Sequence, residues 1–203
     1  MLNVGLTGNI ASGKTAVAGL FRDWGATIID ADAIVRRLQQ PGTAIFQKIV
    51  DHFGPQALRP DGALDRPALR ARILADPAEK RALEAIVHPA VEAERRRLMR
   101  RAAARQDGIV IHDIPLLFEA MDPARFDAIV LVDAPGPVRL ARLIQHRGLP
   151  EGDATRLIAA QLPAEPKRAR AHFIIDNDGS RDLLRDRAWQ VWRKLVSRAR
   201  ALA

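Results

Sequence analysis

The chain has 203 residues, of which 48% are hydrophobic and 28% are charged. This length and mixture are typical of one globular domain, and they exclude wholesale disorder. No cysteine is present, which excludes disulfide frameworks, thiolate metal sites and cysteine nucleophiles. The first residues lack the layout of a signal peptide, and no apolar run approaches a membrane span, so we expect a cytoplasmic protein without membrane contact.

The charge balance is basic, with 32 Lys and Arg residues against 24 Asp and Glu residues, a net charge of +8. Such a surface attracts polyanions, including nucleic acids. Aromatic residues, however, make up only 4% of the chain and Tyr is absent, so side chains that stack on bases are scarce. We therefore expect no requirement for nucleic acid, and a phosphorylated small molecule fits the charge equally well.

The first thirty residues predict a strand, a helix and a second strand. The apolar run 2–7 ends in a glycine-rich turn, a helical pattern covers 14–24, and Gly25 stands where a helix commonly ends. The run 26–30 is the second strand. A strand, helix and strand this close together predict a parallel sheet with right-handed crossovers.

Residues 33–105 contain no convincing strand. Asp76 and Pro77 form a helix start, with Asp as the N-cap and Pro at the first position. Pro89 is expected to interrupt that helix, because it has no N–H group and disfavours helical geometry at His88. A second, arginine-rich helix is then expected over 89–105. The segment is too long for an ordinary crossover and predicts a helical insertion.

Three more strands are expected over 109–113, 128–133 and 173–176. Helices are expected over 137–146 and 182–201, and a short helix that follows the turn 148–150 is expected to end at about 161. The predicted fold is α/β, with a five-stranded parallel sheet and helices on both faces. We expect a single domain over 1–203. Its core comprises about 1–35, 106–140 and 171–203, the helical insert about 36–105, and a small helical lid about 141–170.

The strongest motif is the string Gly8-Asn9-Ile10-Ala11-Ser12-Gly13-Lys14-Thr15, which matches the phosphate-binding loop (P-loop) pattern between a strand and a helix. Its glycines let consecutive N–H groups face one anion, and the helix adds its positive end. Lys14 is expected to reach the β- and γ-phosphates of a nucleotide, and the Thr15 hydroxyl to ligate Mg²⁺.

Carboxylates follow two of the predicted strands. Asp30 and Asp32 follow the second strand, and either one is a candidate to orient or deprotonate a hydroxyl group. Capping of the next helix is an equally good interpretation of Asp32. In one division of the roles, Asp30 caps the helix and Asp32 acts on the hydroxyl group. Asp113, at the end of the third strand, is placed like a carboxylate that supports Mg²⁺.

Basic residues gather after the fourth strand: Arg139, Arg142, Arg147, Arg156 and Lys167. Cations delivered by a lid stabilise the charge of phosphoryl transfer, although a solvated arginine face explains any one of them. His88-Pro89 is a ligand, a catalytic pair or a helix break, and no second ligand stands at metal spacing, so we expect no protein-ligated zinc.

The guanine-reading string Asn-Lys-x-Asp of GTPases is absent, which leaves a compact small-molecule kinase with a lid. The chain resembles the dephospho-CoA kinase family over essentially its whole length. The residues that carry the resemblance are Val4 to Gly8 and the P-loop, Ile29 to Asp32, Pro41-Gly42, Phe53-Gly54, Asp61 to Arg66, His88-Pro89, Asp113 to Glu119, Arg142, Arg147, Gln161, Lys167 and Ile175 to Asn177.

This resemblance implies transfer of the γ-phosphoryl group of ATP, with Mg²⁺, to the ribose 3′-hydroxyl of dephospho-CoA. It implies that Gly8 and Ala11, Ser12, Gly13, Lys14, Thr15 and Ala16 bind ATP, that Asn177 lies near adenine, and that Asp32, Lys14 and Arg142 are catalytic. The acceptor would meet Asp32, His88, Asp113, Pro115, Leu116 and Leu117. We expect a monomer whose partners are these two small molecules.

Two other functions compete with this one, a kinase of a related nucleotide or nucleoside and a basic binding module that uses ATP as a switch. The sequence also departs from the family pattern. Asn9 stands where Gly is usual, which predicts a stiffer loop tip, and Thr15 replaces a common Ser. His172 stands where Asp is usual, which puts an acidic role at that position in doubt.

Overall fold

The computed structural model describes residues 1–104, 108–120 and 122–202. The chain divides into two compact units, one formed by Met1–Ile29 with Met99–Ala203 and the other by Asp30–Leu98. The division falls somewhat earlier in the chain than the expected insert boundaries of 36 and 105. The predicted helix end and insert boundary at residue 105, and the predicted core boundary at 106, lie outside the described residues.

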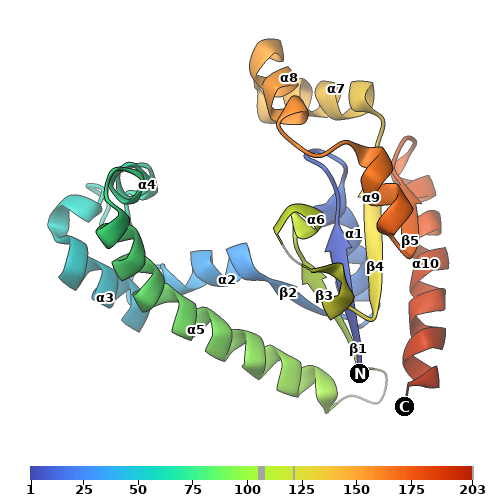
Figure 1. Cartoon of the computed structure of the whole chain (residues 1–203), viewed down its shortest axis with the longest axis horizontal. Coiled ribbons are helices and arrows are strands. Elements are labelled where there is room, and N and C mark those ends of the chain that lie inside the picture. The colour runs from blue at the N-terminus through green and yellow to red at the C-terminus, as the bar shows by residue number, and fades with distance from the viewer. Residues whose placement is uncertain (105–107, 121, 203) are drawn as a thin grey trace. The chain divides into compact units, whose positions relative to one another are not determined.

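The first unit, here called the sheet unit, is built on a five-stranded sheet in the order β2-β3-β1-β4-β5 (Figure 1). The pairs β1/β3, β1/β4 and β4/β5 are parallel, as a chain with helical crossovers requires. The strands are β1 (Leu2–Thr7), β2 (Thr27–Asp30), β3 (Ile109–Asp113), β4 (Ala128–Asp133) and β5 (Phe173–Asp176). The fold class predicted from the sequence is confirmed.

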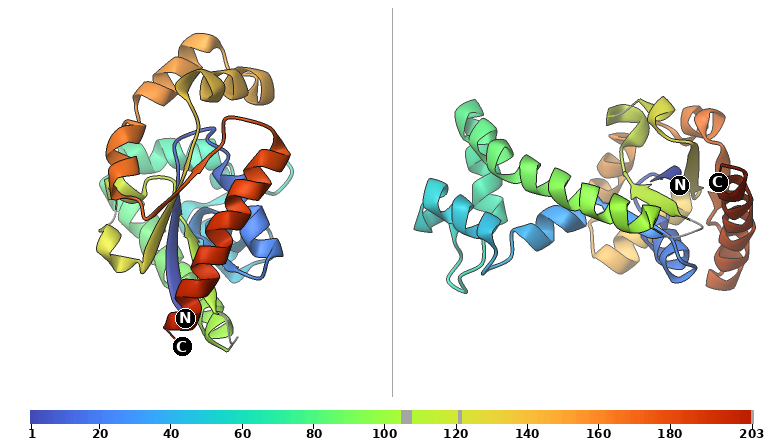
Figure 2. Two further views of the ribbon diagram at one scale, coloured as in Figure 1. Left: turned by 90° about the vertical axis from the view of Figure 1, so that its right-hand side faces the viewer. Right: turned by 90° about the horizontal axis from the view of Figure 1, so that it is seen from below.

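Helices cover both faces of the sheet. On one face α1 (Lys14–Asp23) and α10 (Arg181–Ala201) pack together over the strands, and Figure 2 shows α10 lying along them. Their shared core contains Val4, Leu6, Phe21 and Trp192. On the other face α6 (Leu117–Ala120) contacts β1, and α9 (Ala164–Arg170) contacts β4. Because side chains alternate along a strand, the two faces draw on different residues of the same strands.

Two further helices follow β4 in the sheet unit. These are α7 (Gly136–Arg147) and α8 (Glu151–Ala159), which pack against each other. The glycine turn expected between them is present, with Gly148 as the left-handed cap of α7 at φ 64°. A short 3₁₀ turn, Pro123–Arg125, precedes β4. No helix in the described part of the chain combines the length and apolar character that crossing a membrane requires.

The helical unit has a core of its own. It contains α2 (Ala31–Leu38), α3 (Ala44–Phe53), a 3₁₀ turn (Pro55–Ala57), α4 (Arg66–Ala75) and the first part of α5 (Pro77–Ala103). Ile49, Phe53, Leu69 and Val87 are buried together at the centre of this unit. Such a core explains how a segment without strands stays folded.

The predicted break at Pro89 is wrong, because α5 runs through it as one helix (Figure 1). A proline inside a helix removes one backbone hydrogen bond and strains the preceding turn. The flanking residues Ile86, Val87, Ala90 and Val91 all pack on the core of the helical unit. Tertiary packing therefore outweighs the local preference of the proline.

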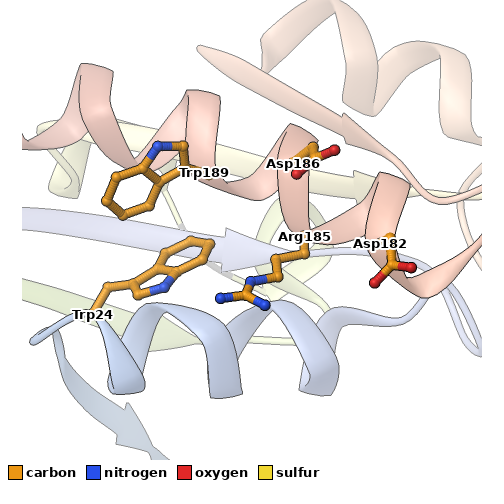
Figure 3. A pocket seen from close by; sticks show the side chains of 5 residues that line it. All are labelled: Trp24, Asp182, Arg185, Asp186 and Trp189. Atoms are coloured by element: carbon orange, nitrogen blue, oxygen red, sulfur yellow. The ribbon is translucent and has the colours of Figure 1, made fainter.

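A cavity of about 550 Å³ opens between Trp24 at the C-terminal end of α1 and the first half of α10. Figure 3 shows the side chains that line it: Trp24, Asp182, Arg185, Asp186 and Trp189. The rings of Trp24 and Trp189 meet edge to face with their centroids 5.0 Å apart. None of these residues belongs to the P-loop motif, so this cavity is separate from the site described next.

Candidate active site

The P-loop joins the end of β1 to the start of α1, in the context that its motif predicted. Gly8 cannot carry a side chain, because a Cβ atom there would lie 2.4 Å from the Val132 carbonyl oxygen. Gly13 has φ 97°, and a Cβ atom there would lie 2.0 Å from Asn177 Nδ2. Both glycines thus permit close backbone approaches at the ends of the loop.

Ala11 also adopts a left-handed conformation, with φ 59°. An L-residue pays about 1–2 kcal/mol for this geometry. Strain of this kind is found at ligand-binding loops, where the surrounding structure holds it in place. In this chain the carbonyl groups of Ala11 and of the buried Ser12 are held by a side chain from α7.

Lys14 and Asp113 form an ion pair beside the P-loop. Asp113 ends β3, in register with Leu6 of the neighbouring β1, so the sheet delivers the carboxylate to the start of α1. Only 14% of the Lys14 side chain and 7% of the Asp113 side chain are exposed. Attraction between charges is stronger at such partly dehydrated positions than in water.

Arg142 of α7 joins the P-loop to the segment after β5. Its Nη1 donates to the carbonyl oxygens of Ala11 (3.2 Å) and Ser12 (3.4 Å). Its Nη2 donates to the carbonyl oxygen (3.0 Å) and Oδ1 (3.2 Å) of Asn177. Asn177 Nδ2 donates in turn to the Ser12 carbonyl at 2.7 Å. The guanidinium group thus places a positive charge next to the carbonyl groups of the P-loop.

The segment after β5 is fixed from its other side by Arg187 of α10. Arg187 Nη1 donates to the Asp176 carbonyl oxygen (2.7 Å) and to Asp178 Oδ1 (2.6 Å). The bond from Arg187 lowers the pKa of the Asp178 carboxyl group below its ordinary value. Arg187 therefore holds the residues on either side of Asn177, and Arg142 holds the backbone of Asn177 itself.

The tip of the P-loop is bound by the segment 161–167. The Ile10 amide donates to Gln161 Oε1 at 2.7 Å, and Asn9 Nδ2 donates to the Leu162 carbonyl at 3.2 Å. The Lys167 ammonium, fully buried, donates to Asn9 Oδ1 at 2.6 Å. It also pairs with Glu119 Oε1 at 2.6 Å. The side chain of Asn9 thus makes two of these contacts, and the stiffer tip expected from the sequence stays a prediction.

Arg168, next to Lys167 on α9, bridges the ends of two strands. Its Nη1 donates to Asp133 Oδ2 and to Asp176 Oδ1, each at 2.7 Å. These carboxylates are register partners at the ends of β4 and β5, where two like charges would repel each other. The hydrogen bonds to Asp176 and Asp133 raise the pKa of Arg168 above its ordinary value.

The segment expected to receive the acceptor follows β3. Pro115 and Leu116 are exposed there, and the Thr7 hydroxyl donates to the Pro115 carbonyl at 3.2 Å. Leu117 has no exposed surface and packs with Phe118 and Ile129. The side chain of Leu117 thus supports the segment from inside, and the expected place of Leu117 among the acceptor-binding residues stays a prediction.

Asp30 and Asp32 divide their roles within the helical unit. Asp30 is the N-cap of α2, and its Oδ1 accepts from the Ala33 amide at 2.8 Å. Asp32 lies exposed in the first turn, so the reading of Asp32 as the cap is wrong. His88 is exposed on α5. The roles expected for Asp32 and His88 stay predictions.

The basic residues expected to gather in a lid are dispersed. Arg139 is buried, with its Nε donating to the Ala134 carbonyl at 3.1 Å. Arg147 is exposed in the last turn of α7, and Arg156 pairs with Asp153. Arg142 and Lys167 alone of the five reach the P-loop, and they bind different parts of it.

His172 occupies the position where the family pattern has an acidic residue. Its Nδ1 accepts a hydrogen bond from the Ile129 amide at 3.1 Å, while its own amide donates to the Ile129 carbonyl at 3.0 Å. A carboxylate can accept the same hydrogen bond. The substitution at this position is thus explained by an acceptor that pairs the start of β5 with β4.

Three features of this site were not predicted from the sequence. They are the bond that Gln161 accepts from the loop, the burial of Lys167, and the bond from Asn177 to the Ser12 carbonyl. Gln161, Lys167 and Asn177 all stood among the residues that carried the family resemblance, which was the available signal. Among the described residues, no three or more His, Cys, Asp or Glu side chains gather as a group suited to a metal ion.

Comparisons with known proteins agree on one family. The family model for dephospho-CoA kinase matches residues 2–182. A dephospho-CoA kinase from Anaeromyxobacter dehalogenans is 46% identical over 91% of this chain and 88% of its own length. One from Streptomyces avermitilis is 45% identical over 98% and 96%.

Two solved structures are similar to this chain in fold. A crystal structure of a Thermus thermophilus protein has a TM-score of 0.74 and 36% identity, covering 95% of this chain and 96% of that one. The dephospho-CoA kinase of Campylobacter jejuni shares the fold, with a TM-score of 0.66 at 23% identity and coverage of 96% and 97%. The family match and the identity along nearly the whole chain confirm the resemblance, and the chain belongs to the dephospho-CoA kinase family.

Proposed function

We propose that this protein transfers the γ-phosphoryl group of ATP to the ribose 3′-hydroxyl of dephospho-CoA, which yields coenzyme A and ADP in the last step of coenzyme A synthesis. The observation that carries the proposal is a P-loop whose Lys14 is paired with the Asp113 carboxylate, in a chain of this family. The hydroxyl oxygen forms a bond to the γ-phosphorus, and the bond from that phosphorus to the bridging oxygen breaks. ADP leaves with the bridging oxygen.

The phosphates of ATP bind at the loop formed by Gly8 and residues 11–16. The amide groups of the loop and the positive end of α1 face the anion. Lys14 exchanges its contact with Asp113 for the β- and γ-phosphates as ATP enters, because the triphosphate carries the larger negative charge. Charge spreads over the γ-phosphoryl oxygens as the bond breaks, and a fixed cation at that point lowers the barrier by several kcal/mol.

Asp32 is the proposed base for the 3′-hydroxyl. Because Asp30 is occupied as the cap of α2, the exposed Asp32 in the first turn of that helix is the carboxylate we assign to the acceptor. It accepts the hydroxyl proton as the oxygen attacks. We assign His88, Asp113, Pro115, Leu116 and Leu117 to the binding of the acceptor.

Mg²⁺ is a proposed companion of ATP, and the side chains present are suited to it. The Thr15 hydroxyl is exposed in the first turn of α1, and the Asp113 carboxylate ends the neighbouring strand. Both offer the hard oxygen atoms that Mg²⁺ prefers. The ion, when bound, neutralises charge on the β- and γ-phosphate oxygens.

Arg142 and Asn177 complete the proposed ATP site. Arg142 adds positive charge behind the phosphates through its contacts with Ala11 and Ser12. Both polar ends of the Asn177 side chain are used within the protein. The backbone next to Asn177 is therefore the part that we assign to adenine.

The test is a coupled assay for ADP with and without dephospho-CoA. We expect ADP release to depend on dephospho-CoA. Release that is equal with another nucleoside acceptor would favour a related kinase, and release stimulated by nucleic acid alone would favour an ATP-driven binding protein. A cytoplasmic location and a monomeric state are part of the proposal. Sedimentation at assay concentration tests the monomeric state, and fractionation of cells tests the location.

A further inference from the structure

The most deeply buried cation of the sheet unit is not used by any step above. No surface of the Lys167 side chain is exposed, and its ammonium group lies 2.6 Å from both Asn9 Oδ1 and Glu119 Oε1. Burying an ammonium group costs several kcal/mol unless partners compensate it. Here the Glu119 carboxylate and the Asn9 amide oxygen compensate the charge, and Asn9 lies within the P-loop.

Asn9 links this cation to the loop in both directions. Its Oδ1 accepts from Lys167, and its Nδ2 donates to the Leu162 carbonyl at 3.2 Å. The neighbouring Ile10 amide donates to Gln161 Oε1 at 2.7 Å. Two consecutive loop residues are thus tied to one distant segment, and a residue without a polar side chain at position 9 would lose two of the three ties.

We propose that Lys167 is a positioning residue, which acts through Asn9 to hold the tip of the P-loop in the shape that receives the phosphates of ATP. Glu119 holds the ammonium group in place. Lys167 does not itself touch the phosphates, because both its partners lie within the protein. A loop ordered before ATP arrives loses less conformational freedom on binding, which strengthens the affinity for ATP. This inference rests on the proposed ATP-dependent function.

Asn9→Ala is the main test variant. It removes the side-chain ties but leaves the pair of Lys167 and Glu119 intact, and it avoids the added backbone freedom of glycine. Arg170→Met is the matched control for Lys167→Met, because Arg170 lies on the same helix, is exposed and sits over the Phe118 ring. Both substitutions remove one positive charge from α9.

The measurements are the affinity for a non-hydrolysable ATP analogue with Mg²⁺, amide hydrogen exchange over residues 8–13, and KM for ATP beside kcat. For Asn9→Ala we expect affinity to fall about fivefold to twentyfold, exchange to speed up, and kcat at saturating ATP to change less than threefold, because pre-ordering acts mainly on binding. Arg170→Met should stay within about twofold of the wild type in affinity.

Combining the substitutions tests whether Lys167 acts through Asn9. The double variant Asn9→Ala with Lys167→Met should bind the analogue no more weakly than Asn9→Ala alone, whereas independent effects would multiply. Multiplying effects overturn the proposal, as does Asn9→Ala with unchanged affinity and exchange. Unchanged affinity and exchange in Asn9→Ala overturn the proposal even if Lys167→Met does not fold.

The outcome can be separated from that of the proposed function. The analogue measures ATP binding without any acceptor. A wild-type protein that phosphorylates dephospho-CoA, with Asn9→Ala indistinguishable from it in binding, refutes the positioning role alone. A wild-type protein that binds the analogue but does not phosphorylate dephospho-CoA, with Asn9→Ala weakened, refutes the proposed function alone.

Discussion

Replacing Arg142 with methionine should destabilise the sheet unit even without ATP. Methionine keeps an unbranched stem and a high helix propensity in α7. It removes the four hydrogen bonds by which the guanidinium group joins Ala11, Ser12 and Asn177. The segment after β5 and the P-loop would then be held together by the single bond from Asn177 Nδ2 to the Ser12 carbonyl, among the contacts described above.

The expected loss follows from the lengths of these bonds. Three of them measure 3.0–3.2 Å and one measures 3.4 Å. A hydrogen bond of this kind contributes about 1 kcal/mol net. The longest of the four contributes less, because a hydrogen bond weakens as it lengthens. The free energy of unfolding should therefore fall by about 2–3 kcal/mol, which is roughly a hundredfold in the unfolding equilibrium.

Urea titration followed by tryptophan fluorescence measures this loss. All three tryptophans, Trp24, Trp189 and Trp192, belong to the sheet unit, so their signal reports on the part that Arg142 holds. Arg147→Met is the control, because Arg147 is exposed on the same helix. If the two variants differ by less than about 0.5 kcal/mol, the ordinary range for surface substitutions, the reasoning is refuted.

Four other substitutions test the P-loop and the proposed base. Gly13→Ala should cost about 2–3 kcal/mol by thermal unfolding, from left-handed strain and displacement of the Asn177 side chain, and an unchanged midpoint would contradict the loop geometry. Lys14→Met should nearly abolish transfer in a folded protein, and normal turnover would rule out the phosphate-binding role. Asp32→Asn should lower kcat about a hundredfold with little change in ATP affinity. Asp30→Asn retains the helix cap and should lower kcat much less. Near-normal turnover for Asp32→Asn would mean that another residue is the base.

The strands could be predicted from the sequence because their signal is local. The run 128–133 is apolar up to a terminal aspartate, the run 109–113 is apolar up to His112 and Asp113, and β3 and β4 have these bounds. A central parallel strand is buried on both faces, so its sequence reads as one apolar run. The P-loop was equally clear, since the tight turns at Gly8 and Gly13 depend on residue type.

The course of α5 and the places of the cations could not be predicted in this way. Pro89 has the local chemistry of a break, and only packing on the helical core, far away in sequence, keeps the helix continuous. Lys167 and Arg142 were both read as candidate lid cations, yet one is buried against Asn9 and the other holds loop carbonyls. The partners of Lys167 are 158 residues away at Asn9 and on α6 at Glu119, which no local pattern reveals.

The identity of the phosphorylated atom tests the central claim most directly. Purified protein with ATP, Mg²⁺ and dephospho-CoA should form one ADP for each acceptor consumed, and phosphorus and proton NMR of the product should place the new phosphate on the ribose 3′-oxygen. A phosphate on any other oxygen, or ADP formed without a phosphorylated acceptor, would contradict the proposed reaction.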